Sequence, residues 1–346
     1  AIFSVVRGVM LRPLPYANPD RIVVVWEHNL ARNRARNVIA PSNFVEWRER
    51  NRSFTQLGMA TATRLNFVLA GQPEEVVGTT ASSDLFPVLG VTPALGRAYG
   101  PSEDLENNDR VIIVSHGFWR TRLGGRTDVL GTTINTNGIP RTLIGVMPED
   151  FTLFGEKTDF LVPYGWTLAG LRDTPGRGSS FGLARLRDDV TLAQAESDMK
   201  ALMAQREKEA PRLNTGWSIT LVPAHEQTVD QIRPALQVLA GAVLFVWLVA
   251  CVNVANLLLA RGAVRERELG LRTALGAGRA RIVSQMLAES LLLGLAGGVA
   301  GLALAFVFHR GLLALVADRL PVPRLEQVTL DPTIIVLTFG LSLLTG

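Results

Sequence analysis

Long apolar stretches alternate with stretches of mixed polarity along the chain of 346 residues. Residues 235–260 contain no charge, and residues 286–309 form a second apolar stretch with one acid, Glu289, near its start. Because about 20 apolar residues span a bilayer as a helix, we predict a membrane helix over each. Residues 1–12 and 333–346 read as the end and the start of two further such helices. We therefore expect the sequence to be cut within a membrane helix at both ends.

Residues 20–230 have the mixed polarity of a folded domain, and they are long enough to bury a core of their own. Stretches rich in Val and Ile predict strands over residues 21–28, 66–69, 74–80, 111–116, 181–187 and 217–223. Asn137 and Gly138 mark the turn of a hairpin over residues 132–147. The mixture of strands and helices predicts an α+β domain of two lobes, joined to a transmembrane bundle of helices.

Helical spacing of apolar positions predicts helices over residues 41–54, 117–124 and 191–211. In the first helix we expect Ser42 to be the N-cap and Phe44, Trp47 and Phe54 to lie on the buried face. Residues 82–104 contain three prolines, so we expect loops and short turns there.

Arginines set the expected topology. The segment 261–285 carries six of them, whereas the three arginines of residues 310–332 are balanced by three acids. The positive-inside rule then places residues 261–285 in the cytoplasm and residues 20–230 outside it, in the periplasm or at the cell surface of a bacterium. The net charge is only +4, and arginines that flank membrane helices account for part of it, so we expect no binding to nucleic acid.

No set of residues in the sequence is typical of catalysis. The four histidines, His28, His116, His225 and His309, are isolated from one another, and the one cysteine, Cys251, lies in a predicted membrane helix. No GxxxxGK[ST] motif for nucleotide phosphates occurs. We therefore expect no enzyme activity, no metal and no cofactor in this chain.

Small and polar residues inside the predicted membrane helices indicate packing between helices. Gly294 with Gly298, and Gly297 with Gly301, form two overlapping GxxxG pairs that predict a close helix contact. The alternative is that glycine is simply common in such helices. Asn253 and Asn256 are expected to face protein, more in a structural hydrogen bond than in a transport path.

The segment RERELGLRTALGAGRARIVSQMLAES, residues 265–290, combines charge with a stripe of leucines. As a helix over residues 263–275 it places Leu271, Ala274 and Leu275 on one stripe, and Gly276 is a suitable end. We interpret it as a short helix across the inner membrane surface that contacts a cytoplasmic protein. The alternative is a lipid-surface anchor, which the acids beside the arginines disfavour.

The same segment carries a family pattern. The pattern R-x-R-E-[IL]-G-x-R-x-A-x-G-A is matched from Arg265 to Ala277, with Leu269 in place of the commoner isoleucine. This region resembles the FtsX-like permease domain of MacB-type ABC transporters. The preceding residues, including PSNFVEWRERNRSF and NGIPRTLIGVMPEDF, are similar to a MacB-like periplasmic core domain. The resemblance covers essentially the whole chain and is closest to the duplicated orphan permeases first described in acidobacteria.

The resemblance implies the permease half of a transporter in the bacterial inner (cytoplasmic) membrane, with four helices and with residues 20–230 periplasmic or extracellular. It implies a cytoplasmic ATPase partner whose motion is passed to the outer domain, and a second permease half as a homodimer or internal duplicate. One lobe would comprise residues 20–80 and 180–224, and the other would be inserted between them. The residues implied in ATPase docking are Arg265, Arg267, Glu268, Leu269, Gly270, Leu271, Arg272, Ala274, Leu275, Gly276 and Ala277.

Efflux or extrusion is the function that the resemblance implies first. A transmembrane regulator that controls a periplasmic partner, such as a cell-wall hydrolase, is the alternative and would use the same cytoplasmic helix. A third reading is an adhesive or enzymatic outer domain on a passive anchor in the lipid bilayer.

Overall fold

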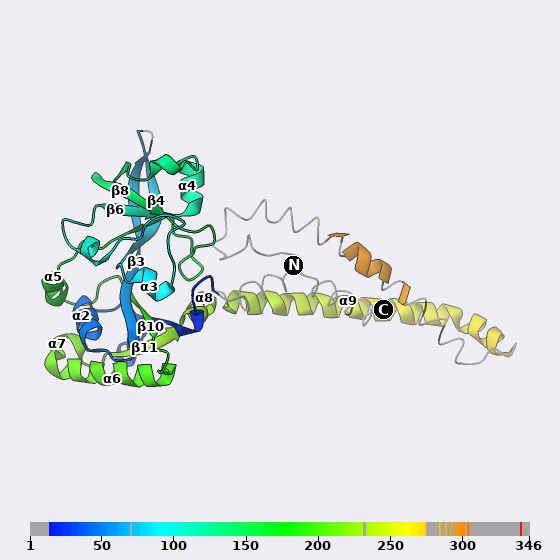
Figure 1. Cartoon of the computed structure of the whole chain (residues 1–346). Coiled ribbons are helices and arrows are strands. Elements are labelled where there is room, and N and C mark those ends of the chain that lie inside the picture. Colours follow the sequence, from blue (N-terminus) through cyan, green and yellow to red (C-terminus); the bar gives the residue numbers. More distant parts are fainter. Residues whose placement is uncertain are drawn as a thin grey trace. The chain divides into compact units, whose positions relative to one another are not determined.

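The computed structural model describes residues 14–69, 71–230 and 233–274, together with residues 284, 288, 291, 292, 295–301, 303, 304 and 340. The chain divides into two compact units. The first is Pro13–Thr228, and the second contains the long helix α9 (Arg233–Ala274). Figure 1 shows the strands and shorter helices of the first unit and the single long helix of the second.

The first unit is an α+β domain, as the sequence predicts. Its strands are β1 (Ile22–Asn29), β2 (Arg34–Asn37), β3 (Phe54–Leu69), β4 (Gln72–Ala81), β5 (Leu95–Gly96), β6 (Val111–Val114), β7 (Thr133–Thr136), β8 (Ile139–Val146), β9 (Phe160–Val162), β10 (Phe181–Leu186) and β11 (Ser218–Pro223). Its α-helices are α2 (Pro41–Arg50), α3 (Leu85–Leu89), α4 (His116–Arg122), α5 (Leu168–Asp173), α6 (Leu192–Glu209), α7 (Pro211–Asn214) and α8 (Ala224–Asp230). Short 3-10 helices are η1 (Pro19–Arg21), η2 (Leu30–Arg32), η3 (Pro101–Asp104) and η4 (Thr127–Val129).

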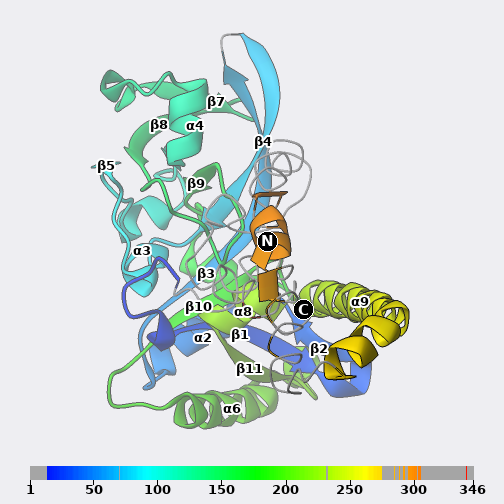
Figure 2. The ribbon, with the colours of Figure 1, turned by 90° about the vertical axis from the view of Figure 1, so that its right-hand side faces the viewer.

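One sheet runs through the whole unit, in the order β11-β1-β10-β3-β4-β9-β6-β8-β5. Strand β3 belongs to both ends, because its first part pairs with β10 and its last part with β7. In Figures 1 and 2, α6 and α4 lie at opposite ends of the unit, with β3 and β4 running between them. The two predicted lobes are thus two ends of one continuous sheet.

Each end has its own core, and a third cluster joins them. Phe44 and Trp47 of α2 and Met199 of α6 belong to the first core, while Phe67 and Phe160 belong to the core beneath α4. The joining cluster lies around α3 and the residues that enter β1. The middle of the sheet shows little regular pattern of apolar residues. Burial of the large side chains in these clusters is therefore the main contribution to the stability of the sheet.

Local signals explain the best predictions. Asn137 and Gly138 both have positive φ, 51° and 81°, so the predicted hairpin is confirmed with the tight turn that these residues favour. The hydroxyl of Thr191 accepts a hydrogen bond from the Gln194 amide, and the Gln194 side chain accepts one from Thr191, so a capping box starts α6.

Three predictions about α2, β3 and β4 were wrong in detail. The N-cap of α2 is Ala40 rather than Ser42, because Pro41 occupies the first helical position, where its fixed φ suits a helix start. Phe54 is buried as predicted, but it lies in β3. The strands expected near 66–69 and 74–80 are parts of a longer hairpin, which has a weak apolar pattern because its middle residues are alternately half-buried and exposed.

Helix α9 is unbroken from Arg233 to Ala274. This differs from the separate short helix that the sequence pattern suggested after residue 262. The residues from Ala263 to Ala274 are mostly good helix formers and include no proline, so nothing in them stops the helix. Within the part of the chain that the structure describes, one helical segment is long and apolar enough to cross a membrane, Ala240–Leu257, with a mean hydropathy of 2.0.

Candidate functional site

The residues expected to contact an ATPase lie at the end of α9. Arg265, Arg267, Glu268, Leu269, Gly270, Leu271, Arg272 and Ala274 occupy its last turns, whereas Leu275, Gly276 and Ala277 fall outside the described residues. At 1.5 Å per residue, Leu271 is about 21 Å along the helix axis from Leu257, where the apolar segment ends.

The predicted packing glycines are described only in part. Gly297, Gly298 and Gly301 are helical, and Gly294 lies outside the described residues. A Cβ atom added to Gly297 or Gly301 would meet no described atom within 4 Å. The close helix contact therefore stays a prediction. The predicted membrane segment over residues 1–12 also falls outside the described part of the chain, and of the one over residues 333–346 only residue 340 is described.

Helix α9 carries exposed apolar side chains between Val238 and Leu259. Val238 is 75% exposed, Phe245 67% and Leu259 73%. Such a surface needs lipid or protein to cover it. Asn253 and Asn256 are exposed as well, so the hydrogen-bond partners expected for them are not seen within the described residues.

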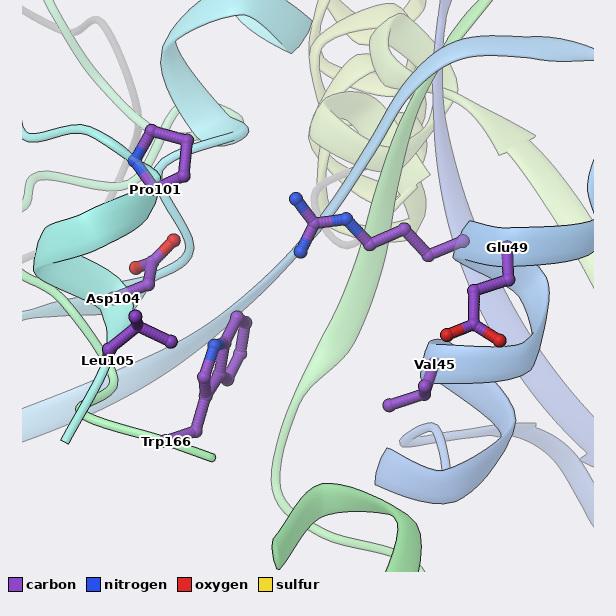
Figure 3. Close-up of a pocket in the computed structure, with 7 residues that line it drawn as sticks. Val45, Glu49, Pro101, Asp104, Leu105 and Trp166 are labelled. Carbon is purple, nitrogen blue, oxygen red and sulfur yellow. The ribbon is translucent and has the colours of Figure 1, made fainter. Parts of the chain in front are cut away.

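A cleft in the first unit was not predicted from the sequence. It has a volume of about 310 Å³ and lies between one face of α2 and the residues of η3. Figure 3 shows Val45 and Glu49 of α2 on one side, and Asp104, Leu105 and Trp166 among the residues on the other. Arg48 and Pro101 complete the lining.

Short contacts fix the η3 side of the cleft. The backbone amide of Trp166 donates to the carbonyl oxygen of Asp104 at 2.8 Å, which attaches the Trp166 segment to η3. The Trp166 ring stacks on Tyr164 with 4.8 Å between ring centroids and also packs on Phe44. The Glu103 carboxylate accepts from the Gly100 amide at 2.9 Å and so caps the start of η3.

The turn after β4 brings a second acid to this region. Ser82, Ser83 and Asp84 follow β4 directly, and Ser82 and Asp84 pack against β3 where Gly58 leaves room. A Cβ atom on Gly58 would lie 2.7 Å from Ser82 Oγ and 3.0 Å from Asp84 Cβ. The Ser83 amide then donates to Asp104 Oδ2 at 2.7 Å, so this turn and η3 are held together.

Burial dominates the electrostatics of the two aspartates. It raises the pKa of Asp104 to about 6, although hydrogen bonding to Ser83 works in the opposite direction. Burial also raises the pKa of Asp84, and the charge of Arg48 opposes that rise. Arg48 Nη2 lies 3.1 Å from Asp84 Oδ2. The cleft is thus lined by the buried Asp104 and by Arg48, and the buried Asp84 lies next to it as the ion-pair partner of Arg48.

The ionisable side chains that line the cleft are Arg48, Glu49 and Asp104, and none of its lining residues is a serine, cysteine, histidine or lysine. In the described residues no group of three or more metal-ligating side chains occurs. The isolated His28 has a local role, since its Nδ1 atom is 3.0 Å from the Thr220 hydroxyl of the neighbouring strand.

Comparison with known proteins gives a family description for each of the two parts of the chain. The family description "MacB-like periplasmic core domain" matches residues 1–202, and "FtsX-like permease C-terminal" matches residues 240–346. The macrolide export ATP-binding/permease protein MacB of Burkholderia thailandensis is 29% identical over 228 residues, which are 64% of this chain and 34% of that protein. The pyoverdine export ATP-binding/permease protein PvdT of Pseudomonas syringae pv. tomato is 26% identical over 234 residues, or 66% and 35%.

The chain spans about a third of the length of these curated relatives. Among solved structures, a domain of a putative permease protein from Porphyromonas gingivalis has a TM-score of 0.46 at 16% identity, covering 60% of this chain and 92% of that one. The periplasmic region of MacB from Actinobacillus actinomycetemcomitans has a TM-score of 0.43 at 16% identity, covering 68% and 97%.

Proposed function

Because the chain belongs to the family with a MacB-like periplasmic core domain, we propose that it is the permease part of an ABC-type efflux system. The names of its relatives combine export, ATP binding and permease. This sequence has no phosphate-binding GxxxxGK[ST] motif. In our proposal ATP is therefore hydrolysed by a cytoplasmic ATP-binding unit, and this chain holds no cofactor and catalyses no reaction of its own.

The observation that carries the proposal is the continuity of α9. A helix of 42 residues is about 63 Å long. Its apolar segment Ala240–Leu257 covers only about 27 Å, close to the thickness of a bilayer core. In our proposal the remaining turns, with Arg265 to Ala274, extend beyond that core and move together with the membrane segment.

An unbroken helix passes movement from one end to the other. In the proposed mechanism, the ATP-binding unit contacts the last turns of α9 and displaces them when ATP is bound or hydrolysed. Only two residues separate α8 from the start of α9, and α8 follows β11 directly. Movement of α9 therefore acts first on β11 and on β1, which pairs with it at the edge of the sheet.

The same proposal places the protein in the inner membrane, with the first unit in the periplasm. The exposed apolar residues of α9 would be covered by lipid and by a second permease half, either another copy or an internal duplicate. A periplasmic partner is a further candidate, because movement delivered to the first unit needs something to act on.

Co-purification with the cognate ATP-binding unit tests the contact at the end of α9. Leu271→Asp places a charge in the proposed contact, and we expect it to reduce co-purification strongly. Leu30→Asp is the matched control, since Leu30 is 73% exposed in the first unit and remote in sequence from α9. Undiminished association of the Leu271 variant would remove the proposed docking role.

Export assays distinguish the efflux function from the regulatory alternative. Loss of the gene should lower export of a substrate if the chain is an efflux permease. Normal export together with capture of a periplasmic hydrolase by the first unit would instead favour the regulator.

A further inference from the structure

Three buried polar atoms without an aligned hydrogen-bond partner gather beside the cleft of α2 and η3. They are Ser83 Oγ, Asp84 Oδ2 and Asp104 Oδ1. The three residues are only 5%, 8% and 2% exposed. Buried polar atoms are nearly always paired in native proteins, so three such atoms in one place, two of them carboxylate oxygens that only accept, indicate a missing donor.

The charges of this cluster do not balance. Two carboxylates face a single guanidinium, that of Arg48, whose side chain is 36% exposed. Arg48 Nη2 is 3.1 Å from Asp84 Oδ2 without an aligned hydrogen bond, and it makes only a long bond of 3.5 Å to Asp84 Oδ1. Asp104 receives the Ser83 amide on Oδ2, and the nearby Ser83 hydroxyl is not aligned with it. The cluster therefore lacks one positive charge.

The shape and the chemistry of the cleft define what can supply that charge. The described residues contain no group of three metal-ligating side chains, which disfavours a divalent ion. A primary ammonium group has three donors and one charge. Val45, Pro101, Leu105 and the Trp166 indole offer apolar contact beside it in a cleft of about 310 Å³, the lower end of the usual size for small-molecule sites.

We propose that this cleft binds an organic primary amine, whose ammonium group pairs with Asp104 and whose apolar part lies against Leu105 and Trp166. Because Asp104 Oδ1 is shielded from solvent, a side chain has to move for the ligand to enter. Arg48 lines the cleft and is loosely held, so we expect it to be the one that swings away. The site lies wholly within Pro13–Thr228 and does not depend on the proposed ATP-driven movement.

Fluorine NMR of para-fluorobenzylamine tests the site in the full chain, reconstituted in nanodiscs at about neutral pH. The neutral para-fluorobenzyl alcohol is the control ligand, and empty nanodiscs account for partition into lipid. We expect saturable binding of the amine alone. Asp104→Asn should weaken it roughly tenfold or more, because hydrogen bonds to charged groups contribute most of such affinity.

A second variant makes the opposite prediction. Arg48→Gln removes the competing cation and should tighten amine binding several-fold, which misfolding would not do. Asp150→Asn, a matched change at an exposed acid, should leave binding unaltered. Binding should also weaken between about pH 7.5 and pH 5, because Asp104 takes up a proton near pH 6.

Three results would overturn the site. They are no saturable binding of the amine to the wild type, equal binding of the alcohol, and unchanged affinity in both the Asp104 and Arg48 variants. If the amine does not bind, buried water molecules are the remaining hydrogen-bond partners for Ser83 Oγ, Asp84 Oδ2 and Asp104 Oδ1. None of these results bears on the contact of Leu271 with an ATP-binding unit, so the two proposals fail separately.

Discussion

The buried ion pair of Glu27 and Arg177 allows a quantitative prediction. Glu27 in β1 is fully buried, and its carboxylate accepts from Arg177 Nε, from the Ala40 amide at 3.1 Å and from Asn43 Nδ2 at 2.9 Å. The Arg177 guanidinium also donates to the Leu213 carbonyl oxygen at 3.0 Å. We consider Arg177→Met, which keeps the apolar stem and removes the charge.

Protonation of Glu27 limits the cost of this change. Burial already raises the pKa of Glu27, and Arg177 is the largest influence that lowers it. Without Arg177 the Glu27 carboxylate takes up a proton in the folded state. For a group with an ordinary pKa of 4.5, this protonation at pH 7 lowers the free energy of unfolding by at most about 3.4 kcal/mol. The bond to Leu213 and the position of the guanidinium 3.3 Å above the Trp217 ring add a loss that does not depend on pH.

The sign of the pH dependence follows from linkage. The folded variant keeps a proton that the unfolded chain loses above pH 4.5, so its stability falls as pH rises. We expect Arg177→Met to lower the free energy of unfolding by about 3–5 kcal/mol at pH 7 and by about 2 kcal/mol at pH 5.

Urea unfolding followed by tryptophan fluorescence measures this loss. Five of the six tryptophans lie in the first unit, so the signal reports mainly on that unit. Arg64→Met is the control, because the Arg64–Glu75 pair is 70% and 65% exposed and should matter little at either pH. A loss for Arg177→Met that is equal at both pH values would refute the reasoning.

Other substitutions have defined outcomes. Gly78→Ala places a Cβ atom 2.5 Å from the Phe160 ring and should cost about 1–3 kcal/mol in urea unfolding, whereas Gly100→Ala meets nothing within 4 Å and should be neutral. Gly117→Ala in α4 should stabilise by about 0.5–1 kcal/mol in the same measurement, and a loss would show a hidden clash. Between pH 4 and pH 6.5, the free energy of unfolding of Asp104→Asn should rise by up to about 3 kcal/mol relative to that of the wild type. The reason is that burial raises the pKa of Asp104, so ionisation of this acid over that pH range destabilises the folded wild type but not the variant. Equal pH profiles for the two proteins would contradict this.

Local signals made much of the fold predictable. The Asn137-Gly138 turn and the Thr191 cap act within four residues, so the sequence alone identifies them. The extent of β3 and β4 depends on their pairing with each other and with neighbours such as β10, which no local pattern encodes. Gly78 has no local reason either, since its role is to make room for Phe160 from β9.

The cleft could not be predicted from the sequence for a similar reason. Asp104 lies in a run of residues typical of a helix start, and Arg48 lies two positions before another arginine of α2, Arg50. Only the tertiary fold buries Asp104 and brings it to Ser83, 21 positions earlier. The continuity of α9 was missed because a change from apolar to charged residues marks the edge of a membrane, while a helix ends only where its backbone is interrupted.

Hydrogen exchange of β11 tests the central claim most directly, with the chain bound to its ATP-binding unit and with and without ATP. The comparison is between wild type, Ala263→Pro, which breaks α9 beyond its apolar segment, and Ala263→Leu, which keeps it helical. If movement travels along α9, ATP changes exchange at Ser218–Pro223 in the wild type and the leucine variant but not in the proline variant. An ATP-dependent change that persists unaltered in the proline variant, with the ATP-binding unit still attached, would contradict the claim.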